Sequence, residues 1–179
     1  MAPSLASPSA FPCDAPVVEQ SEPRGAATVG AKAGGLRAIA LGVVWRGASI
    51  LVGEGHDAVK AETFYRPLGG GIAFGERGDD ALRREFHEEI GVEIEIARQL
   101  GALENIFTYA GRPGHEICLI YEATLRDASL YRCERFEGAE EDGMLFLATW
   151  KPLTDFTGGD RRYPDGLLAI LQRAKVSSA

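Results

Sequence analysis

Apolar and polar positions become ordered at about residue 37, and the first elements that they predict are strands. Residues 38–44, Ala-Ile-Ala-Leu-Gly-Val-Val, form a short apolar run of the kind found in buried strands. Arg46 and Gly47 supply a turn, and residues 49–52, Ser-Ile-Leu-Val, return as a second strand. The folded part of the chain is therefore expected to begin with a β-hairpin.

Strand patterns resume after residue 91. Residues 92–96 alternate strictly between apolar and acidic side chains, which is typical of a strand with one solvated face. Three further apolar and aromatic runs predict strands, at 105–109, 115–124 and 144–150. The glycines and proline of residues 110–114 predict a turn, and the charged stretch 134–143 predicts a loop.

Two segments carry the helical period. In the first, Leu82 and Phe86 belong to an apolar stripe that repeats every fourth residue as far as Ile90. Asp79 or its neighbour Asp80 can cap the first turn, and the glycine at position 91 suits a left-handed C-terminal residue. A helix is therefore predicted over the residues that precede this glycine.

The second helix is predicted to begin at Tyr163-Pro164-Asp165, with Pro164 at its first helical position. Its apolar stripe consists of Leu167, Leu168 and Leu171. The whole order is strand, strand, helix, several strands, helix, without an internal repeat. This order indicates an α+β fold in which helices cover a mixed β-sheet.

Residues 1–35 differ in composition from the rest of the chain. They are rich in Ala, Pro, Ser and Gly, contain five of the nine prolines and show no structural period. We interpret them as a flexible N-terminal extension, and residues 36–179 as the folded domain. A transit peptide is an alternative that three acidic residues argue against. An arm that folds onto a partner subunit in a homodimer is another.

Charge and cysteine content narrow the class of partner. The net charge of −7 argues against binding nucleic acid through charge alone. Phosphate-bearing small molecules stay compatible, because a bound metal reverses the local field. Three cysteines without a CxxC pair predict a reducing compartment, the cytoplasm, and neither a disulfide framework nor a zinc site. No run approaches the ~18 apolar residues of a membrane helix, and a signal peptide is not expected.

The first predicted helix carries three glutamates on one side. Glu85, Glu88 and Glu89 are spaced i, i+3, i+4, so they lie about a turn apart and repel one another. A divalent cation would relieve this repulsion, and hard oxygen ligands suit Mg²⁺ or Mn²⁺. A solvated acidic face is the alternative. Glu89 argues against it, because seven residues after Leu82 it lies at the edge of the buried stripe.

A longer motif surrounds these glutamates, and segment 70–92 resembles the Nudix box. The match covers nine fixed or class-restricted positions with the spacing of that motif: Gly70, Glu76, Arg84, Glu85, Phe86, Glu88, Glu89, Gly91 and Val92. Chance agreement at so many positions is very improbable. The flanks, from about Arg37 to the C-terminus, are also similar to the family, though less specifically.

The resemblance implies a Nudix-type α/β/α sandwich and hydrolysis of a pyrophosphate bond in a nucleoside diphosphate linked to another moiety. The implied cofactor is Mg²⁺, with Mn²⁺ as a substitute. The implied metal ligands are Glu85, Glu88, Glu89 and the carbonyl oxygen of Gly70. Either Glu85 or Glu88 would be the base that takes a proton from the attacking water. Glu76 and Arg84 would pair and support the site.

Side chains outside the motif are candidates for contacts with the substrate. Arg66 and Arg112 could hold a phosphate, and Tyr109 or Phe107 could stack on a base. For each, an ordinary place on the surface or on a strand face is the alternative.

Some family members take a base or an extra ligand from a distant loop. The loop glutamates here are Glu134, Glu137, Glu140 and Glu141, and solvated charge explains each of them well. Glu116 could turn toward the cleft, although cross-strand pairing explains it equally well. His115 is expected at the surface.

The substrate stays open at this level. The signature of the NADH-cleaving group is absent, and the proline typical of the ADP-ribose group is missing before Pro113. Tyr109 falls where the dinucleoside polyphosphate group carries a tyrosine, and a nucleoside triphosphate is equally compatible. The competing class is a non-catalytic nucleotide or metabolite sensor on the same fold. Retention of all three box carboxylates favours an enzyme.

Overall fold

The computed structural model describes residues 35–139 and 144–176, so the predicted N-terminal extension, apart from Gly35, lies outside the described residues. The elements follow in the order β1 (Leu36–Arg46), β2 (Ser49–Asp57), β3 (Glu62–Arg66), α1 (Gly78–Ile90), β4 (Ile94–Tyr109), β5 (Arg112–Leu125), the 3₁₀ turn η1 (Leu130–Arg132), β6 (Arg135–Ala139), β7 (Leu145–Pro152), α2 (Leu153–Gly158), β8 (Arg161–Arg162) and α3 (Leu167–Val176).

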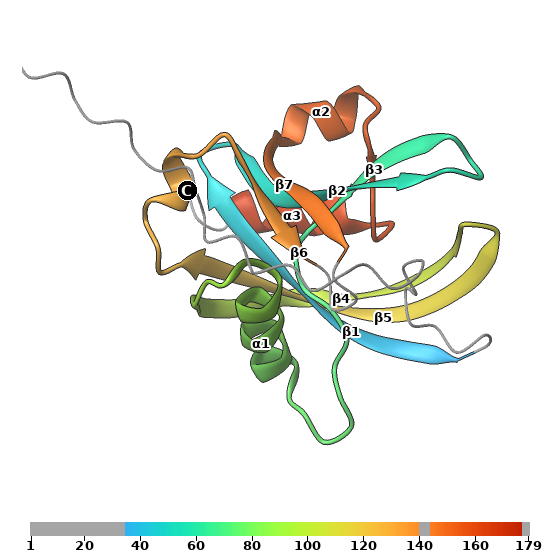
Figure 1. Ribbon diagram of the computed structural model, residues 1–179, viewed down its shortest axis with the longest axis horizontal. Helices are drawn as coiled ribbons and strands as arrows, with labels where there is room; N and C mark the ends of the chain where they lie inside the picture. Colours follow the sequence, from blue (N-terminus) through green and yellow to red (C-terminus); the bar gives the residue numbers. More distant parts are fainter. Residues whose placement is uncertain (1–34, 140–143, 177–179) are drawn as a thin grey trace, which may run out of the picture.

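The strands form a mixed sheet whose main order is β4-β5-β1-β2-β3-β8, with β7 paired to β2 and β6 paired to β7. β1 runs parallel to β5 from Leu36 to Val44. Its antiparallel pairing with β2 is confined to Trp45 and Arg46, next to the predicted turn. The sheet therefore divides into a half built on β4, β5 and β1 and a half built on β2, and the β1–β2 hairpin joins them (Figure 1).

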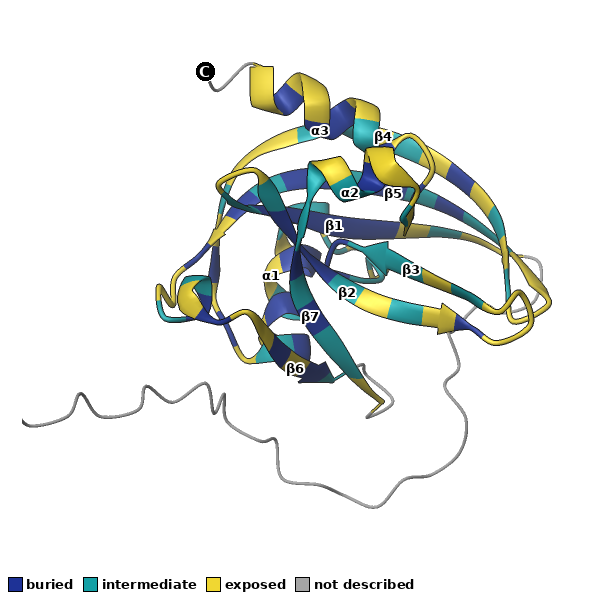
Figure 2. Ribbon diagram, turned by 90° about the horizontal axis from the view of Figure 1, so that it is seen from above, coloured by how far each residue is buried: buried dark blue, intermediate teal, exposed yellow. Residues whose placement is uncertain are grey.

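The apolar run in β1 is explained by burial on both faces. Ala40 and Val44 belong to the core that contacts α1, whereas Ile39, Leu41 and Val43 belong to a second core with residues of α2 and α3. Strands covered on both faces lose the polar alternation of half-exposed strands. Figure 2 shows α3 lying along β4 and α1 beyond β1 on the other side, which confirms the α/β/α sandwich.

α1 packs closely on β1 because Gly42 has no side chain. A Cβ atom at Gly42 would lie 2.7 Å from the ring of Phe86, which is fully buried together with Leu82. Burying a side chain of this size contributes about 1.5–3 kcal/mol. The predicted apolar stripe of this helix is therefore the surface through which α1 packs on the sheet.

The ends of α1 agree with the prediction at one terminus only. Gly91 adopts the left-handed conformation with φ 67°, and its N–H donates to the carbonyl of His87. The predicted aspartate cap is wrong. Arg77 is the N-cap, without a side-chain hydrogen bond, and Asp79 and Asp80 lie inside the first turn.

Two predictions about the second half of the chain are corrected. β4 is one long strand where the pattern predicted two, because bulges between Ile96 and Arg98 and between Gln99 and Gly101 interrupt the alternation. Residues 135–139 form β6 instead of a loop, since pairing with β7 buries Phe136 while its charged neighbours stay exposed.

The last helix begins later than predicted. α3 starts at Leu167, and Pro164 precedes it in the turn that follows β8. Leu167 and Leu171 are fully buried, as the stripe predicted. None of the described helices has the length and apolar character needed to cross a membrane.

Candidate active site

A cleft of about 430 Å³ opens between the two halves of the sheet. Residues of β2 and β3 line one side, and residues of β4 and β5 line the other. Between them lies the glycine loop, residues 69–71, which also borders the cleft. The loop is held against β1, because Ala40 donates its N–H to the Gly70 carbonyl at 2.9 Å. From α1, Glu85 and Glu89 reach the cleft.

Glu85 lies directly against the backbone of Gly70. A Cβ atom at Gly70 would fall 2.5 Å from the carboxyl carbon of Glu85, far inside contact distance. Gly70 has no positive φ, so backbone conformation does not require glycine there. The glycine is needed for space, because any side chain would occupy the volume that the Glu85 carboxylate fills.

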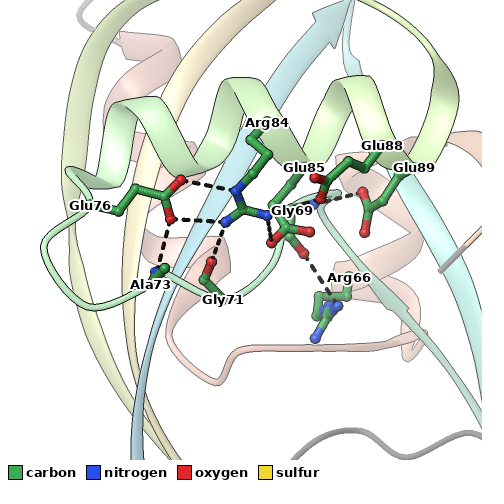
Figure 3. Close-up of polar contacts among 9 residues, drawn as sticks. All are labelled: Arg66, Gly69, Gly71, Ala73, Glu76, Arg84, Glu85, Glu88 and Glu89. Atoms are coloured by element: carbon green, nitrogen blue, oxygen red, sulfur yellow. Dashed lines mark hydrogen bonds and ion pairs between the residues drawn. The ribbon is translucent and has the colours of Figure 1, made fainter. Parts of the chain in front are cut away.

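Glu89 is buried, with 6% of its surface exposed, and its carboxylate accepts a hydrogen bond from the Gly69 N–H at 3.1 Å (Figure 3). Arg66 approaches the same glycine from the other side, where its guanidinium donates a long hydrogen bond of 3.4 Å to the Gly69 carbonyl. The glycine loop is thus fixed between the acidic helix and β3. The expectation that Glu89 needs a partner at its buried position is confirmed.

Arg84 is the hub of the polar network in Figure 3. Its guanidinium donates two hydrogen bonds of 2.9 Å to the carboxylate of Glu76 and one of 2.8 Å to the Gly71 carbonyl. The hydrogen bonds from Arg84, with a further one from the Ala73 N–H, lower the pKa of Glu76 to about 2. The predicted pairing of Glu76 with Arg84 is confirmed, and it ties the loop to the helix.

Arg84 also contacts two of the three glutamates. It lies 2.8 Å from a carboxylate oxygen of Glu85 and 3.0 Å from one of Glu88. The Glu88 side chain is half exposed. An exposed ion pair of this kind is worth about 0–1 kcal/mol, so little free energy holds Glu88 in its present orientation.

The cleft is more acidic than basic. Six carboxylate side chains line it: Glu54, Asp57, Glu62, Glu85, Glu89 and Glu116. Three basic side chains line it: Arg37, Lys60 and Arg66. A polyanionic ligand would be repelled by this balance unless cations accompanied it.

The donors at the glycine loop fit a hard divalent cation. Carboxylate oxygens and a backbone carbonyl are the ligands that Mg²⁺ prefers. The Gly70 carbonyl has already accepted one hydrogen bond from Ala40 and keeps a second lone pair. In the described part of the chain no three acidic, histidine or cysteine side chains already converge as a metal cluster. Arg84 pairs with one carboxylate oxygen of Glu85 and one of Glu88.

The structure separates the predicted substrate contacts into two groups. Arg66, Phe107 and Tyr109 all line the cleft. Tyr109 packs edge-on against Phe64, with ring centroids 5.8 Å apart. Arg112 is exposed at the start of β5 and is not among the residues that line the described cleft. The expectation that it reaches the same site as Arg66 is therefore not supported by its position.

The glutamates considered outside the motif occupy different places. Glu134 and Glu137 are exposed and lie outside the cleft lining, whereas Glu140 and Glu141 fall outside the described residues. His115 lies at the surface, as expected, and it pairs there with Glu104 at 2.9 Å.

Asp57, at the end of β2, is a residue whose role the pattern did not reveal. It is buried, and its carboxylate accepts hydrogen bonds from the N–H groups of Val59, Lys60 and Ala110. Burial raises the pKa of Asp57, but these donors and the Lys60 charge together lower it. Asp57 thereby joins the β2–β3 turn to the β4–β5 hairpin. An aspartate just before a turn was the available signal.

Two buried polar residues lie in the wall of the cleft formed by β4 and β5, and their position there was not predicted from the sequence pattern. Asn105 and Glu116 each expose 4% of their surface, and both line the cleft. Both interpretations of Glu116 have support, because it faces a basic residue across the strand pairing and also lines the cleft. Its register partners are Arg37 and Asn105, and within the described residues it forms neither a salt bridge nor a hydrogen bond through its side chain.

A model of the NUDIX domain family matches residues 36–163. The chain belongs to the Nudix family. This match covers most of the chain and includes the whole motif at 70–92, together with the flanks that resembled the family less specifically.

Solved structures agree with this assignment at the level of the fold. A NUDIX hydrolase from Nitrosomonas europaea has a TM-score of 0.55 at 13% identity, over 80% of this chain and 90% of the other. The MutT protein from Methanosarcina mazei Go1 has a TM-score of 0.55 at 12% identity, over 80% and 95%. The E. coli ORF135 protein has a TM-score of 0.52 at 16% identity, over 79% and 92%.

Family membership and fold together support a hydrolase of pyrophosphate bonds in nucleotide-like small molecules. Nudix hydrolases generally use divalent metals such as Mg²⁺, which agrees with the donor chemistry of Glu85, Glu89 and Gly70.

Proposed function

We propose that the chain is a Mg²⁺-dependent pyrophosphohydrolase, for which Mn²⁺ can substitute. Its substrate is a nucleoside diphosphate linked to another moiety: a dinucleoside polyphosphate, a nucleoside triphosphate or an ADP-ribose-like molecule. The observation that carries this proposal is the contact of the Glu85 carboxylate with Gly70 in the cleft, where Glu89 is also buried. Arg66, Phe107 and Tyr109 line the same cleft and offer partners for a phosphate and a base.

The proposed metal ligands are Glu85, Glu88, Glu89 and the Gly70 carbonyl. A divalent cation held by these groups would neutralise charge on the diphosphate and lower the pKa of the attacking water. An acidic cleft needs such a counter-charge before it can accept a polyanion. Glu88 supplies its carboxylate after leaving Arg84, which costs little because this pair is exposed.

The remaining steps belong to the protein side chains. Glu85 or Glu88 accepts a proton from the attacking water. Arg66 stabilises a phosphate oxygen, and Tyr109 stacks on the base. The Glu76–Arg84 pair keeps the loop and α1 in register, since it joins Ala73 and Gly71 to the helix. Catalysis is then mainly positioning and charge neutralisation, as phosphoryl chemistry requires.

The test is a panel of nucleoside diphosphate derivatives incubated with the full chain and Mg²⁺ or Mn²⁺. Released phosphate and mononucleotide are measured, with EDTA as the metal-free condition. We expect metal-dependent cleavage of at least one compound, and its loss in Glu85→Gln. Glu104→Gln is the matched control, because Glu104 is exposed and pairs with His115. Binding of nucleotides without any cleavage would replace the enzyme with a sensor on the same fold.

A further inference from the structure

Glu116 and Asn105 form a polar pair that the hydrolytic site does not use. They are directly opposite each other in the antiparallel β4–β5 register, so their side chains share a face. Residues opposed in this way have Cβ atoms roughly 4.5–5.5 Å apart. Both line the cleft, and both are more than nine-tenths buried. An amide and a carboxylate therefore lie side by side in the cleft wall.

The hydrogen-bonding capacity of the pair is only partly used by the protein. The Asn105 Oδ1 atom accepts a long hydrogen bond of 3.4 Å from the Asp165 N–H, which directs the amide nitrogen away from that contact. The side chain of Glu116 has no hydrogen bond or salt bridge among the described residues. The carboxylate presents its oxygens to the cleft from a wall that buries the rest of the side chain, and they are not among the described buried side-chain atoms that lack a partner. A ligand that donates hydrogen bonds to these oxygens would therefore bind favourably.

The pair requires two kinds of group in one ligand. An ionised carboxylate only accepts hydrogen bonds, whereas the Asn105 amide nitrogen offers two donors. The ligand must therefore present N–H donors toward Glu116 and an acceptor toward Asn105. A simple cation would satisfy Glu116 alone. Arg37 would repel such a cation, because it lines the cleft and lies on β1 directly opposite Glu116.

Among nucleobases, guanine meets this requirement most completely. Its N1–H and 2-amino group are adjacent donors for the two oxygens of a carboxylate, and its O6 atom is an acceptor next to them. Adenine offers one amino group beside an acceptor nitrogen, so one carboxylate oxygen would stay unpaired. Uracil has a single N–H between two acceptors. Phe64, Tyr109 and Tyr163 also line the cleft and provide aromatic surface for a base.

We propose that Glu116 and Asn105 form a guanine-recognition subsite, which makes a guanosine diphosphate derivative the preferred substrate class. This proposal rests on the proposed function, because it assigns the base of the same nucleotide. Glu116 would accept the N1–H and 2-amino hydrogens, and Asn105 would donate to O6. Hydrogen bonds to a charged group of this kind change affinity about ten- to a hundredfold.

Binding is measured separately from turnover to test this assignment. The probes are hydrolysis-resistant α,β-methylene diphosphates of guanosine, inosine and adenosine, titrated into the full chain with Mg²⁺ by calorimetry. Inosine lacks only the 2-amino group, so it isolates one of the two bonds to Glu116. We expect the guanosine analogue to bind at least tenfold more tightly than either of the others.

Glu116→Gln is expected to bring the three affinities within about threefold of one another, since an amide can accept from guanine with one atom only. Glu104→Gln lies on the same strand pair outside the cleft and should keep the wild-type preference. Thermal unfolding of each variant verifies that it is folded. If Glu116→Gln is unfolded, the ratio of the wild-type affinities for the guanosine and inosine analogues still tests the proposal, and a ratio near one would overturn it.

Failure of the subsite and failure of the enzyme assignment give different results. Metal-dependent cleavage of the panel without a base preference would overturn the guanine proposal and leave the hydrolase intact. A guanine preference that depends on Glu116, without cleavage, would support the subsite and reject the hydrolase. Absence of binding by all three analogues would overturn the subsite.

Discussion

Gly70→Ala tests the closest contact of the site. The added Cβ atom would fall 2.5 Å from the carboxyl carbon of Glu85, whereas ordinary contact begins at 3.4 Å. The carboxylate must therefore move by about 1 Å, and a displacement of that size in an active site costs on the order of a hundredfold in rate. A hundredfold is about 2.7 kcal/mol of transition-state stabilisation.

The fold should tolerate this substitution. The clashing atoms are the end of a flexible side chain, and Gly70 does not have a positive φ. The assay is kcat/KM for a cleaved substrate with Mg²⁺, together with thermal unfolding. Gly71→Ala is the matched control: a Cβ there meets only the Arg37 guanidinium, at 3.6 Å, within the described residues. Activity of Gly70→Ala within threefold of Gly71→Ala would refute the role of the Glu85 position.

Three further predictions concern the metal, the loop and the extension. Glu88→Gln should lower turnover by orders of magnitude without unfolding the protein, because it removes charge and keeps shape; near-normal turnover would refute its role as a ligand. Glu76→Gln should remove a pH-dependent part of stability. The folded pKa of Glu76 is lowered from 4.5 to about 2, so its contribution is complete above about pH 4.5 and is lost as the pH falls toward 2. Urea unfolding at pH 7 and at pH 3 checks this, and an equal difference between wild type and variant at both pH values would contradict it. Deletion of residues 1–35 should leave kcat/KM largely intact, and a large loss would show that the extension belongs to the site or to a homodimer contact.

Local patterns were sufficient for the elements whose burial is set by near neighbours in sequence. The stripe of Leu82 and Phe86 and the glycine at position 91 define α1, because helix contacts recur within a few residues. Residues 38–44 similarly predict a strand. Because the run is apolar at nearly every position, burial on both faces could be expected without knowing which elements cover it.

The errors arose where distant pairing decides the structure. β6 contains charged residues that are acceptable in a strand only because β7 pairs with it and buries Phe136. The bulges of β4 shift its register against β5 after Ile96, so the strict alternation seen at residues 92–96 does not continue along that strand. Pro164 suits the start of a helix in sequence, but the turn after β8 places it before α3.

The candidate site shows the same division. The spacing of the motif brings Glu76 and Arg84 together and places Glu85 on Gly70. The sequence could not predict that Asn105 lies opposite Glu116, because their pairing depends on the register of a long hairpin with two bulges. The exposed position of Arg112 likewise depends on where that hairpin turns.

Cation binding by the three glutamates is the claim on which the rest depends, and titration of Mn²⁺ followed by electron paramagnetic resonance measures it most directly. The full chain should bind Mn²⁺, and Glu85→Gln, Glu88→Gln and Glu89→Gln should each weaken that binding at least tenfold, whereas Glu104→Gln should leave it unchanged. Equal Mn²⁺ affinity in all five proteins would contradict the account.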